Sequence, residues 1–207
     1  MFPISHFNIT RTPFYYYDKT LLSNTLAKLI RLAGERNYHI HYAVKANANP
    51  EILKLIAASG IGADCVSGGE IKAALEAGFP AKKIVFAGVG KADWEIEYAL
   101  EKKIFCFNVE SAEELSVIEE LAKKKENIAS IALRINPNID AHTHEYITTG
   151  LSENKFGIPI EMLDSIFSQI QRSPHVQLVG FHFHIGSQIL NLETFHVLCE
   201  RINQLQD

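Results

Sequence analysis

The stretch that decides the fold covers residues 39–50, with the sequence HIHYAVKANANP. It reads as a short strand that ends on one lysine, followed by two asparagines and a proline that open a helix. Alternation along the strand places His41, Ala43 and Lys45 on one side. A lysine that points inward at a strand end needs a partner or a function, because lysine is almost never fully buried unpaired. Taken alone, Lys45 is most often a snorkelling or salt-bridged side chain.

The same change from strand to helix recurs along the chain. Short apolar runs predict further strands over 61–66, 84–87, 104–108, 131–135 and 176–184, each followed by a segment with helical spacing of apolar residues. Side chains suited to helix N-caps precede several of these helices, namely Asn49, Ser67 and Ser111. Upstream, Asp18 caps a first helix that follows a predicted aromatic strand over residues 13–17.

Six β-α units without hairpin signals predict a parallel sheet. A doubly wound sheet would carry G-x-G-x-x-G after its first strand, and this chain has no such motif. Polar residues instead stand at the carboxyl ends of the predicted strands, namely Lys45, Asp64, Asn108, Arg134 and His184. This distribution is typical of the active face of a (β/α)₈ barrel. Residues 136–158 show no periodicity and are expected to form a long loop on the same face.

Composition narrows the class of protein. The 207 residues are 47% hydrophobic and 21% charged, as in ordinary globular proteins. A net charge of -4 argues against a nucleic-acid partner, and no apolar run approaches the ~20 residues of a membrane span. Three widely spaced cysteines, Cys65, Cys106 and Cys199, predict reduced thiols. The N-terminus lacks a basic segment followed by an apolar run, so we expect no secretory signal and a cytoplasmic location.

Five short motifs then occur in a recognisable order. They are HYAVKAN at 41–47, DCVSGGE at 64–70, FNVES at 107–111, LRINP at 133–137 and FHIGS at 183–187. Together they resemble the fold-type III pyridoxal-phosphate (PLP) decarboxylases, over residues 14–207. Within that family, DAHTHEYITTG at 140–150 and NKFGI at 154–158 are similar to the diaminopimelate decarboxylases.

The resemblance implies an α/β fold, the alanine-racemase-like (β/α)₈ TIM barrel, followed by a C-terminal β-domain. Here it implies about six β-α units over 21–207 and an N-terminal segment, 1–20, that pairs with that β-domain. The family's glycine-rich phosphate loop, the acidic partner of the pyridine nitrogen and the β-domain motifs are expected beyond Asp207. We therefore expect residues 1–207 alone to be inactive. The family works as a head-to-tail homodimer with active sites at the subunit interface.

The implied activity is PLP-dependent decarboxylation of meso-2,6-diaminopimelate to L-lysine, the last step of lysine biosynthesis. The cofactor supplies the electron sink, and the protein supplies orientation and electrostatics. By resemblance, Lys45 is the Schiff-base lysine and His184 lies against the pyridine ring. Ser187 donates to the cofactor phosphate, Arg134 sits near the ring 3-oxygen, and Asp64 supports the site.

Other interpretations of these residues remain open. His184 is equally a core histidine, Ser187 a turn serine, and Arg134 the ion-pair partner of Asp64 or Glu70. Glu70 alternatively belongs only to a capping box with Ser67.

Two further segments carry no assigned role. The long loop has side chains that either cover the substrate, meet the other subunit or are solvated, namely His142, His144, Tyr146 and Lys155. Residues 88–91, GVGK, weakly resemble a phosphate loop and are interpreted as a strand-end turn.

Three alternatives compete with this function. The related carboxynorspermidine, arginine and ornithine decarboxylases share its chemistry. A metal-dependent barrel hydrolase would use one of three His-x-His pairs, His39/His41, His142/His144 or His182/His184. It leaves Lys45 and Ser187 without roles, so we predict no metal site. A domain that binds PLP without catalysis is the third alternative.

Overall fold

The computed structural model describes all of the chain except residues 1–2, 138–155, 187–188 and 206–207. It divides into two compact units, Met1–Ile40 and His41–Asp207. Within the described residues, no helix is both long enough and apolar enough to cross a membrane.

The first unit contains a short helix, α1 (Ile4–Phe7), and a longer one, α2 (Lys19–Gly34). Asp18 caps α2 as predicted, and its side chain accepts a hydrogen bond of 2.9 Å from the Leu21 N–H. The predicted strand over 13–17 is wrong, because none of these residues joins a sheet. Aromatic contacts form instead, with the Phe7 ring 5.4 Å from that of Phe14 and 5.1 Å from that of Tyr16.

The second unit is built on a parallel sheet. Its strands are β1 (His41–Ala43), β2 (Gly62–Cys65), β3 (Ile84–Phe86), β4 (Cys106–Val109), β5 (Ala129–Asn136), β6 (Ile158–Pro159) and β7 (Val176–Phe183). Strands β1 to β5 pair in chain order, and β7 and the two-residue β6 both pair with β5. Neighbours in the sheet therefore follow one another along the chain, as in a barrel, whereas a doubly wound sheet reverses its order. The prediction of a parallel α/β barrel sheet is confirmed.

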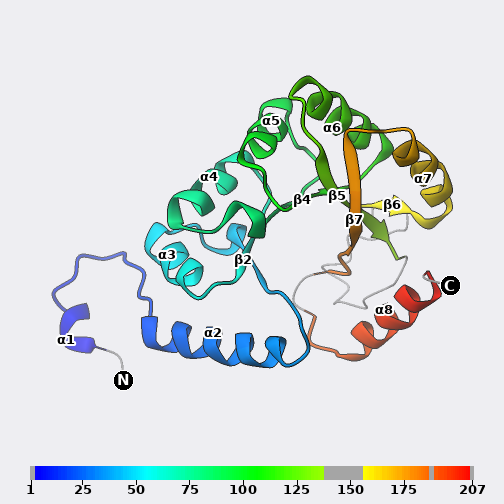
Figure 1. Ribbon diagram of the computed structural model, residues 1–207. Coiled ribbons are helices and arrows are strands. Elements are labelled where there is room, and N and C mark those ends of the chain that lie inside the picture. The colour runs from blue at the N-terminus through cyan, green and yellow to red at the C-terminus, as the bar shows by residue number, and fades with distance from the viewer. Residues whose placement is uncertain (1–2, 138–155, 187–188, 206–207) are drawn as a thin grey trace. The chain divides into compact units, whose positions relative to one another are not determined.

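Helices on one side of the sheet connect the strands, namely α3 (Pro50–Ala58), α4 (Gly68–Ala77), α5 (Asp93–Lys102), α6 (Ala112–Lys124) and α7 (Leu163–Gln171). A further helix, α8 (Glu193–Gln204), follows β7. Figure 1 shows α3 to α7 in an arc outside the strands. Short 3₁₀ turns occupy Val44–Ala46, Ala81–Lys83 and Ile160–Met162.

The core lies between this arc and the sheet. In β5, the alternate residues Ile131, Leu133 and Ile135 are fully buried on the side that faces the helices. Leu115 and Ile118 of α6 are also fully buried. Each such side chain contributes about 1.5–3 kcal/mol by leaving water. The intervening residues of the strands face the opposite side, and the predicted polar residues lie there.

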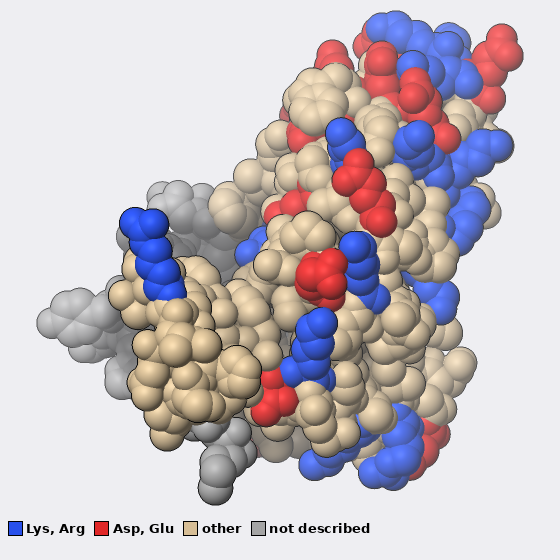
Figure 2. Space-filling view, turned by 90° about the vertical axis from the view of Figure 1, so that its left-hand side faces the viewer, with Lys and Arg blue, Asp and Glu red and all other residues tan. Residues whose placement is uncertain are grey.

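The outer surface of the helices carries mixed charges. Ion pairs between neighbouring turns are exposed, as in Lys72–Glu76 and Lys124–Glu120. On the face shown in Figure 2, acidic and basic side chains are interspersed and neither sign forms a continuous patch.

Candidate active site

The register of the sheet places the predicted polar residues on one face. Asp64 of β2 aligns with Ala43 of β1 and with Val85 of β3. Since aligned residues of parallel strands share a face, their side chains point to the same side of the sheet. Val85 aligns with Cys106, and Asn108 lies two residues further along β4 on the same face.

The alignment continues across the rest of the sheet. Asn108 aligns with Ala132, and two residues further along β5, Arg134 aligns with His182 of β7. The register shifts between Ile131 and Ala132, so that Leu178 of β7 aligns with Ile131 but Gly180 aligns with Ala132. His182 therefore lies on the same face as Arg134. Such bulges often re-aim side chains beside functional sites. The contact of Phe181 with Phe167 of α7, at 6.2 Å between ring centroids, agrees with this assignment, because it places Phe181 on the helix side.

Lys45 lies just beyond the strand rather than in it. β1 ends at Ala43, and residues Val44–Ala46 form a 3₁₀ turn, so the strand that was predicted to end on Lys45 stops two residues earlier. Lys45 is exposed at this edge. Its charge opposes the rise that burial causes in the pKa of Asp64, and it adds to the fall that burial and Arg134 cause in the pKa of His184. Among the described residues, no carboxylate forms an ion pair with its amine.

Asp64 faces the same region with an unused acceptor. Its Oδ1 is buried and has no hydrogen-bond partner among the described residues. Burial raises the pKa of this carboxyl, Lys45 and Arg134 oppose the shift, and Glu70 adds to it. A buried acceptor without a donor costs free energy, so this position suits a ligand donor.

Glu70 serves the backbone. Its Oε2 accepts a hydrogen bond of 2.8 Å from the Val66 N–H, while Ser67 Oγ accepts one of 3.2 Å from the Glu70 N–H. The capping interpretation of Glu70 is therefore confirmed, with Val66 rather than Ser67 as the donor to its carboxylate.

Arg134 has a partner that the sequence analysis did not identify. Its Nη1 donates to both carboxylate oxygens of Glu110, at 2.6 and 2.7 Å. The alternative interpretation, in which Arg134 pairs with Asp64 or Glu70, is wrong, because its ion pair is with Glu110. Glu110 follows β4 directly, and its position before a capping serine is the signal that could have identified it. Phe156 also lies near Arg134, with its ring centroid 5.5 Å from the guanidinium carbon.

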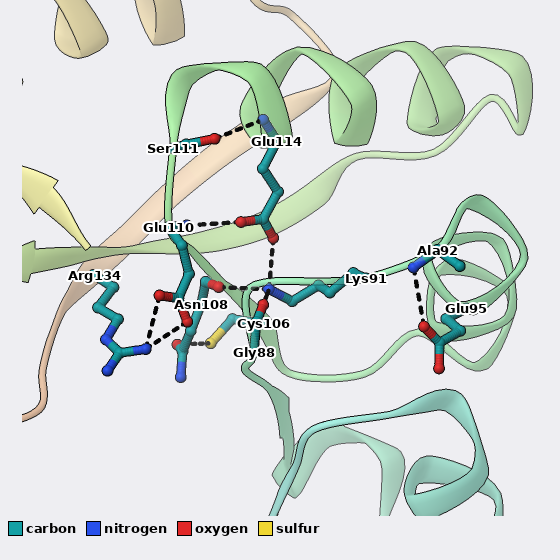
Figure 3. Close-up of polar contacts among 10 residues, drawn as sticks. All are labelled: Gly88, Lys91, Ala92, Glu95, Cys106, Asn108, Glu110, Ser111, Glu114 and Arg134. Atoms are coloured by element: carbon teal, nitrogen blue, oxygen red, sulfur yellow. Dashed lines mark hydrogen bonds and ion pairs between the residues drawn. The ribbon is translucent and has the colours of Figure 1, made fainter. Parts of the chain in front are cut away.

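The turn at 88–91 contains a second residue that sequence reasoning missed. The pattern assigns Lys91 to a simple strand-end turn, but its side chain is only 1% exposed and forms an ion pair of 2.5 Å with Glu114 of α6. Burial raises the pKa of Glu114, and the charge of Lys91 opposes that shift. Figure 3 shows Lys91, Glu114, Glu110 and Arg134 in one connected group.

Two histidines also belong to this face of the sheet: His182 in β7 and His184 just after it. Burial first, and then the charge of Arg134, lower the pKa of His182 to about 4 and also lower that of His184. Nδ1 of His182 is buried without a partner in the described part of the chain. Both rings are therefore neutral at pH 7, and His184 is the more exposed of the two.

The remaining predicted positions divide into two groups. Ser187 and the loop residues His142, His144, Tyr146 and Lys155 lie outside the described residues. Cys65 and Cys106 are buried free thiols, as predicted. Burial raises the pKa of Cys65 to about 12 and that of Cys106 to about 11, so neither is a nucleophile at pH 7. Among the described residues, no three metal-ligating side chains come together.

Known proteins with similar sequences share this arrangement of elements. A diaminopimelate decarboxylase of Bacteroides thetaiotaomicron is 58% identical over 100% of this chain and 54% of its own length. The crystal structure of diaminopimelate decarboxylase from Helicobacter pylori complexed with L-lysine matches 98% of this chain and 52% of that chain, with 43% identity and a TM-score of 0.83. The M. jannaschii enzyme in co-complex with L-lysine matches 97% of this chain and 48% of that chain, with 36% identity and a TM-score of 0.88.

The chain thus spans about half the length of the curated relatives that it matches. A family model described as "Pyridoxal-dependent decarboxylase, pyridoxal binding domain" matches residues 23–207. Because this match spans well over half of the chain, the protein belongs to the pyridoxal-dependent decarboxylase family.

Proposed function

We propose that this chain carries the pyridoxal-binding part of an enzyme that decarboxylates meso-2,6-diaminopimelate to L-lysine. The observation that carries the proposal is the shared face: Lys45, Asp64, Arg134 and His184 meet at the carboxyl ends of parallel strands. Similarity to diaminopimelate decarboxylases over the entire chain supports the choice of substrate.

The described residues fit pyridoxal 5'-phosphate, the cofactor of the family. An anionic, aromatic, carbonyl-bearing molecule needs an amine, cations, a flat contact and a hydrogen-bond acceptor. Lys45 supplies the amine, Arg134 the fixed cation and His184 a neutral ring. Buried Asp64 Oδ1 is an acceptor that lacks a donor from the described residues.

Each side chain has one proposed role. Lys45 would hold the cofactor as the Schiff-base lysine. Arg134, held by Glu110, would place its charge beside the cofactor, and His184 would orient its ring. Asp64 would support the cofactor, and Ser187 would donate to its phosphate. When bound, the cofactor stabilises the carbanion left at the α-carbon by loss of carbon dioxide.

The surroundings of the site complete the proposal. We infer a cytoplasmic homodimer in which segment 1–20 pairs with a β-domain and residues 21–207 belong to the barrel. Residues 1–207 alone are expected to show no measurable turnover. Robust decarboxylation by this segment would contradict that expectation.

The test of Lys45 uses the natural reading frame that contains these residues. Borohydride reduction should fix pyridoxal phosphate on the peptide that carries Lys45, and Lys45→Ala should abolish release of carbon dioxide from meso-diaminopimelate. Lys54→Ala is the matched control, since Lys54 is an exposed lysine of α3 whose amine pairs only with Glu51, at 3.0 Å, among the described residues. Normal turnover by Lys45→Ala would refute the assignment.

The test of the substrate compares products. Lysine should form from meso-diaminopimelate, with little agmatine from arginine or putrescine from ornithine. A preference for arginine, ornithine or carboxynorspermidine would support pyridoxal-dependent decarboxylation but contradict meso-diaminopimelate as the substrate.

A further inference from the structure

We infer that Lys91 is a positioning residue, which fixes Arg134 at the site through Glu114 and Glu110. Its consequence for cofactor binding rests on the proposed function, while its consequence for Arg134 does not. The interpretation of residues 88–91 as a simple turn gives Lys91 no such role.

The ammonium group of Lys91 is fully engaged. It donates to the Gly88 carbonyl at 2.7 Å, to the Asn108 carbonyl at 2.8 Å and to Glu114 Oε1 at 2.5 Å. These acceptors come from three segments: the turn after β3, strand β4 and helix α6. An ammonium group has three donors, so each proton meets its own acceptor. Lys91 therefore locks the ends of two strands to the start of a helix.

Glu114, whose carboxylate is held by Lys91, in turn holds the backbone of Glu110. Its second oxygen, Oε2, accepts a hydrogen bond of 2.7 Å from the Glu110 N–H. Ser111 Oγ accepts a hydrogen bond of 3.2 Å from the Glu114 N–H, which fixes the helix start. The Glu114 side chain is only 14% exposed, so its carboxylate depends on Lys91 for compensation of its charge.

Glu110 in turn holds Arg134. The Glu110 and Arg134 side chains are only 5% and 11% exposed, and the carboxylate bonds one guanidinium nitrogen through both of its oxygens. Figure 3 follows the connection from Lys91 through Glu114 and Glu110 to Arg134. Because each link is buried and hydrogen-bonded, displacement of the first link leaves the last with more freedom.

Two other helices show that a lysine is not needed for the cap itself. In α4, Glu70 accepts from the Val66 N–H, and in α5, Glu95 accepts from the Ala92 N–H at 2.9 Å. The second oxygen of Glu95 accepts from a neutral donor, the Gly68 N–H, at 2.7 Å. Of these three caps, only that of α6 pairs its glutamate with a lysine in the described structure. The capping motif itself therefore does not require a buried lysine. The lysine at Glu114 is found in the one of these three turns that also holds Glu110 and Arg134.

The experiment compares Lys91→Met with the control Lys125→Met in the natural reading frame. Lys125 forms exposed pairs with Glu97 and Glu101 on the outer surface. In the cofactor-free protein, NMR of the Arg134 guanidinium should show faster side-chain rotation in Lys91→Met and no change in Lys125→Met. An unchanged Arg134 signal in Lys91→Met would overturn the inference, whether or not the protein binds pyridoxal phosphate.

A double-mutant cycle gives the second readout. The Kd for pyridoxal phosphate should rise about tenfold in Lys91→Met, as for a lost charge-assisted hydrogen bond. In an Arg134→Gln background, the same change should raise Kd by less than about twofold, because coupled residues are not additive. An equal factor in both backgrounds would show that Lys91 does not act through Arg134.

A third variant guards against simple unfolding of Lys91→Met. Lys91→Met combined with Glu114→Gln removes both charges, and the amide oxygen introduced by the second substitution can still accept from the Glu110 N–H. Neutral replacement of a buried ion pair is often tolerated. This variant should restore Kd to within about threefold of the starting protein, a rescue that depends on the link at Glu114. Failure of this rescue in a folded protein would contradict the relay.

Discussion

The turns that open α4 and α6 have the same capping hydrogen bonds, but a different residue precedes the N-cap serine in each. Both place a serine at the N-cap and a glutamate three residues later, whose carboxylate accepts from the N–H just before the cap. In one turn that preceding residue is Val66, which is 37% exposed, and in the other it is Glu110, which is buried. The cap is therefore a scaffold, and the residue before it decides whether the turn contributes a charge to the site.

Substitution of each residue tests directly whether Val66 and Glu110 differ in their contribution to stability. Glu110→Ala would leave Arg134 buried without its carboxylate, which should lower the free energy of unfolding by about 3–5 kcal/mol. Val66→Ala removes only partly exposed apolar surface and should cost less than about 1 kcal/mol. Urea unfolding of the two variants measures both effects. Equal losses would show that Glu110 is only another turn residue.

The sequence predicts interactions between residues that are close along the chain, but not those between distant residues. The caps at Asn49, Ser67 and Ser111 are local, so spacing alone predicts them, and the parallel sheet follows from the recurring units. The partner of Arg134 is 24 residues away, where several acids compete and only the fold selects Glu110.

Two other features escaped prediction for related reasons. Burial of Lys91 depends on three segments that meet only in the folded sheet. The register shift in β7 also leaves no periodicity of its own, although it decides which face His182 occupies.

His182 and Asp64 extend the comparison to pH, since each has one buried atom without a hydrogen-bond partner among the described residues. His182 on β7 has its pKa lowered to about 4 by burial and by the charges of Arg134, His184 and Lys91. Between pH 6.5 and 4, the unfolded chain takes up a proton that the folded ring does not. The free energy of unfolding should therefore fall as pH drops through this range, by up to about 3 kcal/mol.

Asp64 on β2 should act with the opposite sign. Its pKa is raised, so the folded protein binds the proton more tightly than the unfolded chain does. Stability from this group is lost as pH rises above the ordinary value of 3.8 and through the raised pKa. Unfolding measured from about pH 3.5 to 7.5 should show His182→Gln flattening the acid-side loss and Asp64→Asn removing the loss that accompanies rising pH. A profile unchanged in both variants would contradict the burial of the two groups.

The smallest expected effect separates the two caps themselves. Ser67 and Ser111 accept hydrogen bonds of equal length, 3.2 Å, from the N–H of Glu70 and Glu114. Ser67→Ala and Ser111→Ala should therefore lower the free energy of unfolding equally, by about 1 kcal/mol each. Only Ser111→Ala should also weaken binding of pyridoxal phosphate, by about twofold, because a loosened Glu114 holds Glu110 less firmly. Equal changes in Kd for both variants would mean that both turns reach the site and that Glu110 does not set the α6 turn apart.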